Sequence, residues 1–226
     1  MPPAIKQHIF SKPHMSSSLF TKAMSLTLMA LLLLVMPSCV RDKDAGGEVR
    51  HNLPLSKLRD GDLLFRCGTS TESQAVVKMD QNKGTVYSHV GIVINDGGTW
   101  KVVHAVPGES DNGIDRVKIE PIDTFFLTTR AINGAALRLT QCDSAAAKQA
   151  AQWAQAQCGV EFDDRYDWND RHRLYCTELV QAAYENVGVD LAAGHVSHID
   201  LPLFKGDIVF PSDIASNDSL KVIFSF

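Results

Sequence analysis

The sequence predicts an α+β domain in which helices pack against an antiparallel sheet. In the folded part of the chain, short β-branched runs come first and two apolar helical segments follow them. A turn sequence between two of these runs predicts a β-hairpin, so the strands beside it run antiparallel. This segregation of strands and helices is typical of α+β folds, whereas regular alternation would indicate a parallel sheet.

Residues 1–38 have the features of a signal peptide. Lys6, Lys12 and Lys22 carry positive charge, no Asp or Glu occurs before Asp42, and residues 24–36 form an apolar core of 13 residues. A membrane-spanning helix needs roughly 20 apolar residues, so this core is too short for a permanent span. Met15 is an alternative start, which gives a signal of more usual length.

Cys39 is the predicted attachment point of a lipid. A small residue, Ser38, precedes it at the end of the signal core, which resembles a bacterial lipoprotein processing site. Met36 and Pro37 match that pattern imperfectly, so secretion with an unmodified Cys39 is the alternative. Residues 39–52 are polar and predict a flexible tether. We therefore expect a protein of the bacterial cell envelope, lipid-anchored to a membrane as a periplasmic or outer-membrane lipoprotein.

Composition limits the partners of the remaining domain, residues 53–226, whose length suits one domain with a sizeable core. The chain has 22 Lys and Arg against 26 Asp and Glu, and without the three lysines of the signal segment its net charge is −7. Such an acidic domain lacks the excess positive charge that binding to nucleic acid requires. The sequence contains no Cys-x-x-Cys pair, so we expect no structural zinc. We also expect no other metal and no cofactor.

The strands follow from β-branched runs and turn residues. Asp60-Gly61 predicts a turn into the first strand, and Asn95-Asp-Gly-Gly98 predicts the turn of a hairpin. Strands are predicted at residues 62–65, 88–94, 100–106, 117–120 and 135–139, with one or two short ones after Asp207.

Two longer helices are predicted in the second half. One covers residues 143–157, N-capped by Asp143 or Ser144, and the other covers residues 174–187 and ends at Gly188. Shorter helices are predicted at residues 73–79 and 121–126.

Cys176 is the candidate nucleophile. It lies in the first turn of the apolar helix 174–187, where the helix dipole and free N–H groups lower the pKa of a thiol and can bind an oxyanion. A cysteine packed in the core is the alternative on this helix alone. His89 begins the strand 88–94 and is the candidate base. Gly91 lies on the same strand face and leaves room for another element to approach closely.

His104 supplies a candidate third group. The hairpin brings it near the level of His89 on the same sheet face, within side-chain reach. A thiol, a base and a group that orients the base are what thiol acyl transfer needs. Tyr166 and Tyr175, close to Cys176 in sequence, are candidates for lining a substrate pocket or donating to the oxyanion, with core packing as the alternative.

These segments together resemble a known family. Ser88-His-Val-Gly-Ile-Val, Val-Val-His-Ala ending at Ala105, and Tyr175-Cys-Thr-Glu-Leu-Val are similar to the circularly permuted branch of the NlpC-type papain-like superfamily, in its YiiX/YaeF-like amidase group. The order His, His, Cys is that of the permuted branch. The resemblance implies a papain-like fold, an antiparallel sheet or small barrel packed against helices, with Cys176 as nucleophile, His89 as base and His104 as the third polar residue.

The leading hypothesis is a membrane-anchored thiol hydrolase, an amidase or peptidase of the cell envelope, that cleaves an amide bond in cell-wall peptides. Two alternatives stay open. The same fold can act on lipid acyl groups as a hydrolase or acyltransferase, although the sequence offers no long apolar lid. A lipoprotein that binds a peptide or amino acid without turnover is the second alternative.

Overall fold

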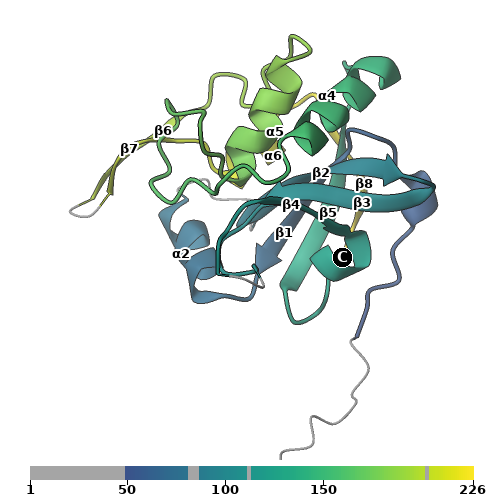
Figure 1. The fold of residues 1–226 in the computed structure, drawn as a ribbon, viewed down its shortest axis with the longest axis horizontal. Helices are drawn as coiled ribbons and strands as arrows, with labels where there is room; N and C mark the ends of the chain where they lie inside the picture. The colour runs from purple at the N-terminus through teal and green to yellow at the C-terminus, as the bar shows by residue number, and fades with distance from the viewer. Residues whose placement is uncertain (1–48, 81–86, 111–112, 202–203) are drawn as a thin grey trace, which may run out of the picture. The chain divides into compact units, whose positions relative to one another are not determined.

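The computed structural model describes residues 49–80, 87–110, 113–201 and 204–226 of the chain. Six antiparallel strands form the main sheet in the order β4-β3-β2-β1-β5-β8 (Figure 1). These strands are β1 (Leu63–Gly68), β2 (His89–Asp96), β3 (Thr99–Ala105), β4 (Val117–Pro121), β5 (Ala131–Leu139) and β8 (Leu220–Ser225). A separate pair consists of β6 (Ser197–Leu201) and β7 (Phe204–Ile208). The predicted α+β class with an antiparallel sheet is confirmed.

The predicted hairpin joins β2 and β3. Gly97 and Gly98 form its turn with φ of +59° and +88°, a region that favours glycine because it has no Cβ. Ile92 pairs with Val103 in the resulting register. β4 then continues the sheet beside β3.

The helices lie on the two faces of the sheet or at its edges. They are the 3₁₀ turn η1 (Leu55–Lys57), α2 (Thr71–Met79), α3 (Ile122–Phe125), α4 (Ser144–Ala156), α5 (Cys176–Glu185) and α6 (Pro211–Ala215). Asp143 caps α4 as predicted, its carboxylate accepting hydrogen bonds from the N–H groups of Ala145 and Ala146 at 2.8 Å. Gly188, which follows α5, has φ of +80°.

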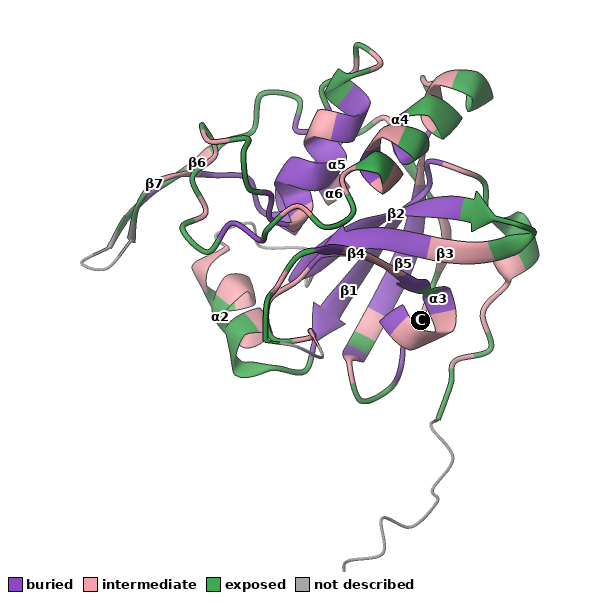
Figure 2. Cartoon of the chain, in the orientation of Figure 1, coloured by how far each residue is buried: buried purple, intermediate pink, exposed green. Residues whose placement is uncertain are grey.

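Two apolar clusters hold these layers together. On one face, strand residues such as Phe65 and Ile92 pack against Leu179 of α5 and the alanines of α4. On the other face, Val93 and Val102 pack against α3. Figure 2 shows buried colour along most of the central strands, whereas the outer turns of α4 are exposed.

The predicted signal peptide, Cys39 and most of the predicted tether lie outside the described residues. The described end of that tether contacts the domain, because the His51 ring lies 4.0 Å from the Phe226 ring. The carbonyl oxygen of Val49 accepts a hydrogen bond from the Thr128 hydroxyl. Within the described ranges, no helix has the length and apolar character needed to cross a membrane.

Candidate active site

Cys176 is the first residue of α5, and hydrogen bonds of the two adjacent residues fix the position of that helix end. The preceding residue, Tyr175, is extended, and its N–H donates to Glu178 Oε2 at 3.1 Å. The Thr177 hydroxyl donates to the carbonyl oxygen of Val209 at 2.7 Å. With one carboxyl group and one backbone carbonyl fixing the first turn, the thiol is held at a defined point where α5 meets the start of β2.

Burial sets the protonation state of the Cys176 thiol. Burial raises its pKa to about 11, although the N–H groups of Val90, Thr177 and Cys176 itself act in the opposite direction. The expected stabilising effect of the helix N-terminus is therefore present but smaller than the desolvation. At neutral pH the thiol keeps its proton, so it needs a base beside it to become a nucleophile.

His89 and His104 contact each other directly, with 2.8 Å between His89 Nε2 and His104 Nδ1. They lie on the same face of the β2–β3 pair, as the hairpin predicts. Gly91 makes this approach possible, because a Cβ there would lie 3.0 Å from His104 Cβ and 2.5 Å from Val102 Cγ2. The predicted role of this glycine as a site of close approach agrees with the geometry.

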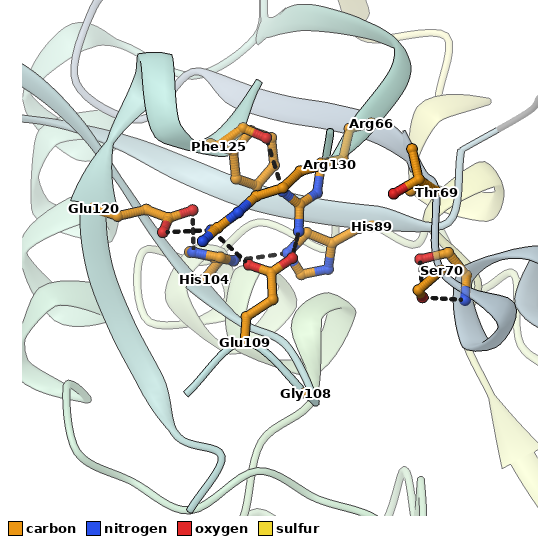
Figure 3. Close-up of polar contacts among 12 residues, drawn as sticks. Arg66, Thr69, Ser70, His89, His104, Gly108, Glu109, Glu120, Phe125 and Arg130 are labelled. Atoms are coloured by element: carbon orange, nitrogen blue, oxygen red, sulfur yellow. Dashed lines mark hydrogen bonds and ion pairs between the residues drawn. The ribbon is translucent and has the colours of Figure 1, made fainter. Parts of the chain in front are cut away.

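Glu120 of β4 extends the contact to a third side chain. His104 Nε2 lies 3.1 Å from Glu120 Oε1, and Figure 3 shows the carboxylate beside the His104 ring. Contact with His104, Lys118 and Arg130 lowers the pKa of Glu120 to about 2, so it is ionised at neutral pH. Sequence reasoning missed Glu120. The available signal was that Lys118 and Glu120 are two residues apart in a predicted strand, so both lie on the same face of it.

The charge on Glu120 determines which nitrogens of the histidines carry protons. A carboxylate accepts only, so His104 Nε2 carries the proton and a neutral His104 presents an unprotonated Nδ1. That Nδ1 accepts from His89 Nε2–H. A neutral His89 then has an unprotonated Nδ1, which is the nitrogen available to act as a base.

Both histidines are held neutral. Burial lowers the pKa of each ring, and the positive charges of Arg66 and Lys118 act in the same direction. The Phe125 ring packs against both imidazoles, with centroids 5.5 Å from His89 and 5.2 Å from His104. His89 is therefore neutral at physiological pH, where it can accept a proton.

A cavity of about 620 Å³ opens onto these groups. Cys176 and His89 both line it, and so do Tyr166 and Tyr175. His104 is fully buried behind His89 and is absent from the lining. The structure thus brings the predicted residues together. The Cys176 thiol and the His89 ring lie at the cavity, and His104 lies behind His89.

Tyr166 takes an unusual backbone conformation at the cavity wall. Its φ is +54°, in the left-handed region that a tyrosine rarely adopts. Buried Asp163 holds the loop, because its carboxylate accepts from the N–H groups of Arg165 and Asp167 at 3.0 and 2.7 Å. Strain of this kind concentrates at functional sites, which favours a binding role for Tyr166 over simple packing.

Charged residues beyond the histidines were also missed by sequence reasoning. Arg66 is buried, lies over the Phe125 ring at 4.5 Å, and donates to Glu109 Oε1 at 2.5 Å. Arg130 contacts Glu109 and Glu120. These residues come from separate strands and loops, so no local pattern groups them.

The polar side chains do not fit a metal site. The nearest nitrogens of His89 and His104 face each other and do not converge on a common point. Among the described residues, no group of three His, Cys, Asp or Glu side chains could hold a metal ion.

The comparisons with known proteins bear on the family and the fold. Residues 57–198 match the family described as permuted papain-like amidase enzymes, YaeF/YiiX, C92 family. Among solved structures, the chain is similar to the crystal structure of the metalloprotein yiiX from Escherichia coli O157:H7, with a TM-score of 0.61 and 19% identity over 75% of this chain and 98% of that one. The curated proteins contain no match to the chain.

Proposed function

The chain belongs to the permuted papain-like amidases of the YaeF/YiiX family, which are cysteine hydrolases, and we propose that it cleaves an amide bond in cell-wall peptides while anchored to a membrane. The observation that carries the proposal is the arrangement of Cys176 and His89 at one cavity, with His104 and Glu120 aligned behind the base. A buried series of polar contacts that ends at a histidine, on the same cavity as a thiol, suits catalysis better than storage of a ligand.

The proposed reaction proceeds through an acyl-enzyme. His89 Nδ1 takes the proton of the Cys176 thiol, and the sulfur attacks the carbonyl carbon of the amide. N–H groups at the start of α5 stabilise the oxyanion. His89 then gives the proton to the leaving amine. Water attacks the thioester while His89 takes one of its protons, and that proton passes to the Cys176 sulfur as the acid leaves. His104 and Glu120 stabilise the imidazolium that forms on His89 between these steps.

The cell-wall substrate follows from the expected location. A lipid on Cys39 and a tether of about a dozen residues, with a span near 20 Å at roughly 5–6 Å × √n, would keep the domain close to the membrane surface. Short peptides of the cell wall are amides within that reach. This location supports the choice of substrate and is itself part of the proposal.

The test compares the unmodified protein with Cys176→Ala on purified muropeptides, with released products identified by mass spectrometry. Cleavage is expected to fall below detection in Cys176→Ala. Cys158→Ala, which removes an exposed cysteine, is the matched control and keeps activity. Equal cleavage by Cys176→Ala would end the proposal. Products released only from phospholipids in a parallel assay would favour lipid chemistry, and binding without products would favour a binding lipoprotein.

A further inference from the structure

Five charged side chains, Arg66, Glu109, Lys118, Glu120 and Arg130, form an ion network beside His104. Figure 3 labels all of them except Lys118. Glu109 contacts Arg66 at 2.5 Å, Arg130 at 3.0 Å and Lys118 at 3.2 Å. Glu120 contacts Arg130 at 3.2 Å and Lys118 at 3.4 Å. Both carboxyl pKa values are lowered and the two histidines are neutral, so three cations face two carboxylates. The network carries one excess positive charge.

Arg130 is the cation of this network that a ligand can reach. Arg66 exposes 2% of its side chain, and Lys118 does not line the cavity. Arg130 lines the same cavity as Cys176 and keeps 31% of its side chain exposed. Both of its carboxylate contacts use Nη1. No hydrogen bond or ion pair within the described part of the chain engages its Nε or Nη2.

An arginine with two adjacent free donors matches a carboxylate in geometry and charge. We propose that Arg130 binds a carboxylate of the substrate, so that the enzyme selects amides of acidic peptides. This inference rests on the proposed function, since it names a feature of the substrate that the same cavity would cleave. An anion at Arg130 would also balance the excess charge of the network.

The remaining lining favours a peptide over a phospholipid as the source of the anion. Thr69, Ser70 and Ser73 line the cavity. Figure 3 shows Thr69 and Ser70 apart from the ion network, on the other side of His89. Thr69 donates to the carbonyl oxygen of Thr129, and Ser70 and Ser73 bond to each other. Their oxygens can still accept from the N–H groups of a peptide, whereas an acyl chain offers them no hydrogen bond.

Binding to the full chain carrying Cys176→Ala tests the proposal without turnover. The probes are the tripeptide L-alanyl-γ-D-glutamyl-L-lysine and the same tripeptide with its carboxylates converted to carboxamides. The free acid is expected to bind roughly 10- to 100-fold more tightly, the size of a charge-assisted pair at a partly buried site. Adding Arg130→Gln is expected to abolish that preference.

Lys118→Gln is the matched control. This substitution removes one positive charge and its contacts with Glu109 and Glu120. Lys118 does not line the cavity, so the lining is unchanged. The preference for the free acid is expected to survive it. If Arg130→Gln does not fold, Arg130→Lys is used, because it keeps the charge but loses the two adjacent donors of the guanidinium. Its preference for the free acid is expected to lie between those of Arg130 and Arg130→Gln.

Equal or absent binding of the two tripeptides would overturn the proposal. So would a preference that survives Arg130→Gln, or an equal loss of preference in Lys118→Gln. Tight Arg130-dependent binding of glycerophosphate without a preference between the tripeptides would also overturn it and point to lipid headgroups. Hydrolysis by the unmodified protein is assayed separately. A preference that depends on Arg130 without hydrolysis would support the carboxylate site and count against the proposed function.

Discussion

His89 and His104 are the same type of side chain in two different positions. His89 lines the cavity with Cys176, whereas His104 is fully buried between His89 and Glu120. This difference makes His89 the candidate proton acceptor and His104 the group that orients it. Glu120 acts through His104, so it is a positioning residue, and its contribution can be separated from a general effect on charge.

Glu120→Gln is expected to lower kcat roughly 100-fold or more while changing KM little. A glutamine amide N–H in place of the carboxylate would face His104 Nε2 and reverse the proton arrangement on both rings, leaving His89 Nδ1 protonated. The measurement is steady-state kinetics on a substrate cleaved by the unmodified protein. Glu109→Gln is the control, because Glu109 contacts the same Arg130 and Lys118 but no histidine. Similar kcat losses in the two variants would contradict the positioning role.

At the scale of elements, the site depends on the β2–β3 pair and on the first turn of α5. The pair brings the two histidines together, and Gly91 leaves room for β3 beside them because a Cβ there would meet Val102 and His104. The helix turn holds Cys176 because Glu178 accepts from the Tyr175 N–H. Each element has one residue whose substitution tests it.

Gly91→Ala is expected to lower the free energy of unfolding by about 1–3 kcal/mol, as overpacking does. The added Cβ would lie 2.5 Å from Val102 Cγ2 and 2.9 Å from the Val103 carbonyl oxygen, so the strands must move apart. Urea denaturation gives the value. Gly206→Ala, also in a strand, meets no atom within 4 Å and serves as control. An unchanged stability for Gly91→Ala would show that the close approach is not required.

Glu178 makes stability depend on pH. Burial raises its pKa from 4.5 to about 8, so the folded state keeps a proton that the unfolded state has lost above about pH 5. The stabilisation is therefore complete at low pH and disappears as pH rises through 8. The free energy of unfolding is expected to fall by up to about 1.4 kcal/mol per pH unit between pH 5 and 8.

Glu178→Gln is expected to remove that slope, measured by urea denaturation across the same pH range. The glutamine oxygen can still accept from the Tyr175 N–H, and it has no proton to lose in this range. Glu185→Gln, on an exposed position of the same helix, is the control and keeps the slope. An identical slope in Glu178→Gln and the unmodified protein would contradict the assignment.

At the scale of the whole molecule, the expected anchor determines where the enzyme works. Cys39→Ala is expected to move the protein from the membrane fraction to the soluble envelope fraction and to abolish incorporation of labelled palmitate. Lipid attachment is the physical cause, since each buried methylene adds about 0.8 kcal/mol to membrane affinity.

Cys158→Ala is the control for this fractionation, because it removes an exposed cysteine of the domain. It is expected to stay with the membrane and to carry the label. Recovery of the unmodified chain in the soluble fraction without label would show that Cys39 is not lipidated.

Most of the fold follows from local patterns in the sequence. The turn at Gly97-Gly98, the cap at Asp143 and the end of α5 near Gly188 each depend on residues a few positions apart. The pair β6 and β7 was missed in part, since only short strands after Asp207 were predicted and β6 begins at Ser197. Its strands pair with each other and not with the main sheet, so the β-branched pattern of a core strand is absent.

The sequence alone determined the α+β class, the hairpin that pairs two histidine strands, and a helix with Cys176 in its first turn. These depend on turn chemistry, side-chain alternation and capping, which act over a few residues. Only the tertiary structure decided that Glu120 lies behind His104, that Arg130 faces the cavity, and that the Cys176 thiol keeps its proton. Those properties depend on burial and on contacts between residues far apart in the chain, because desolvation and ion pairing exist only once the strands and α5 have packed together.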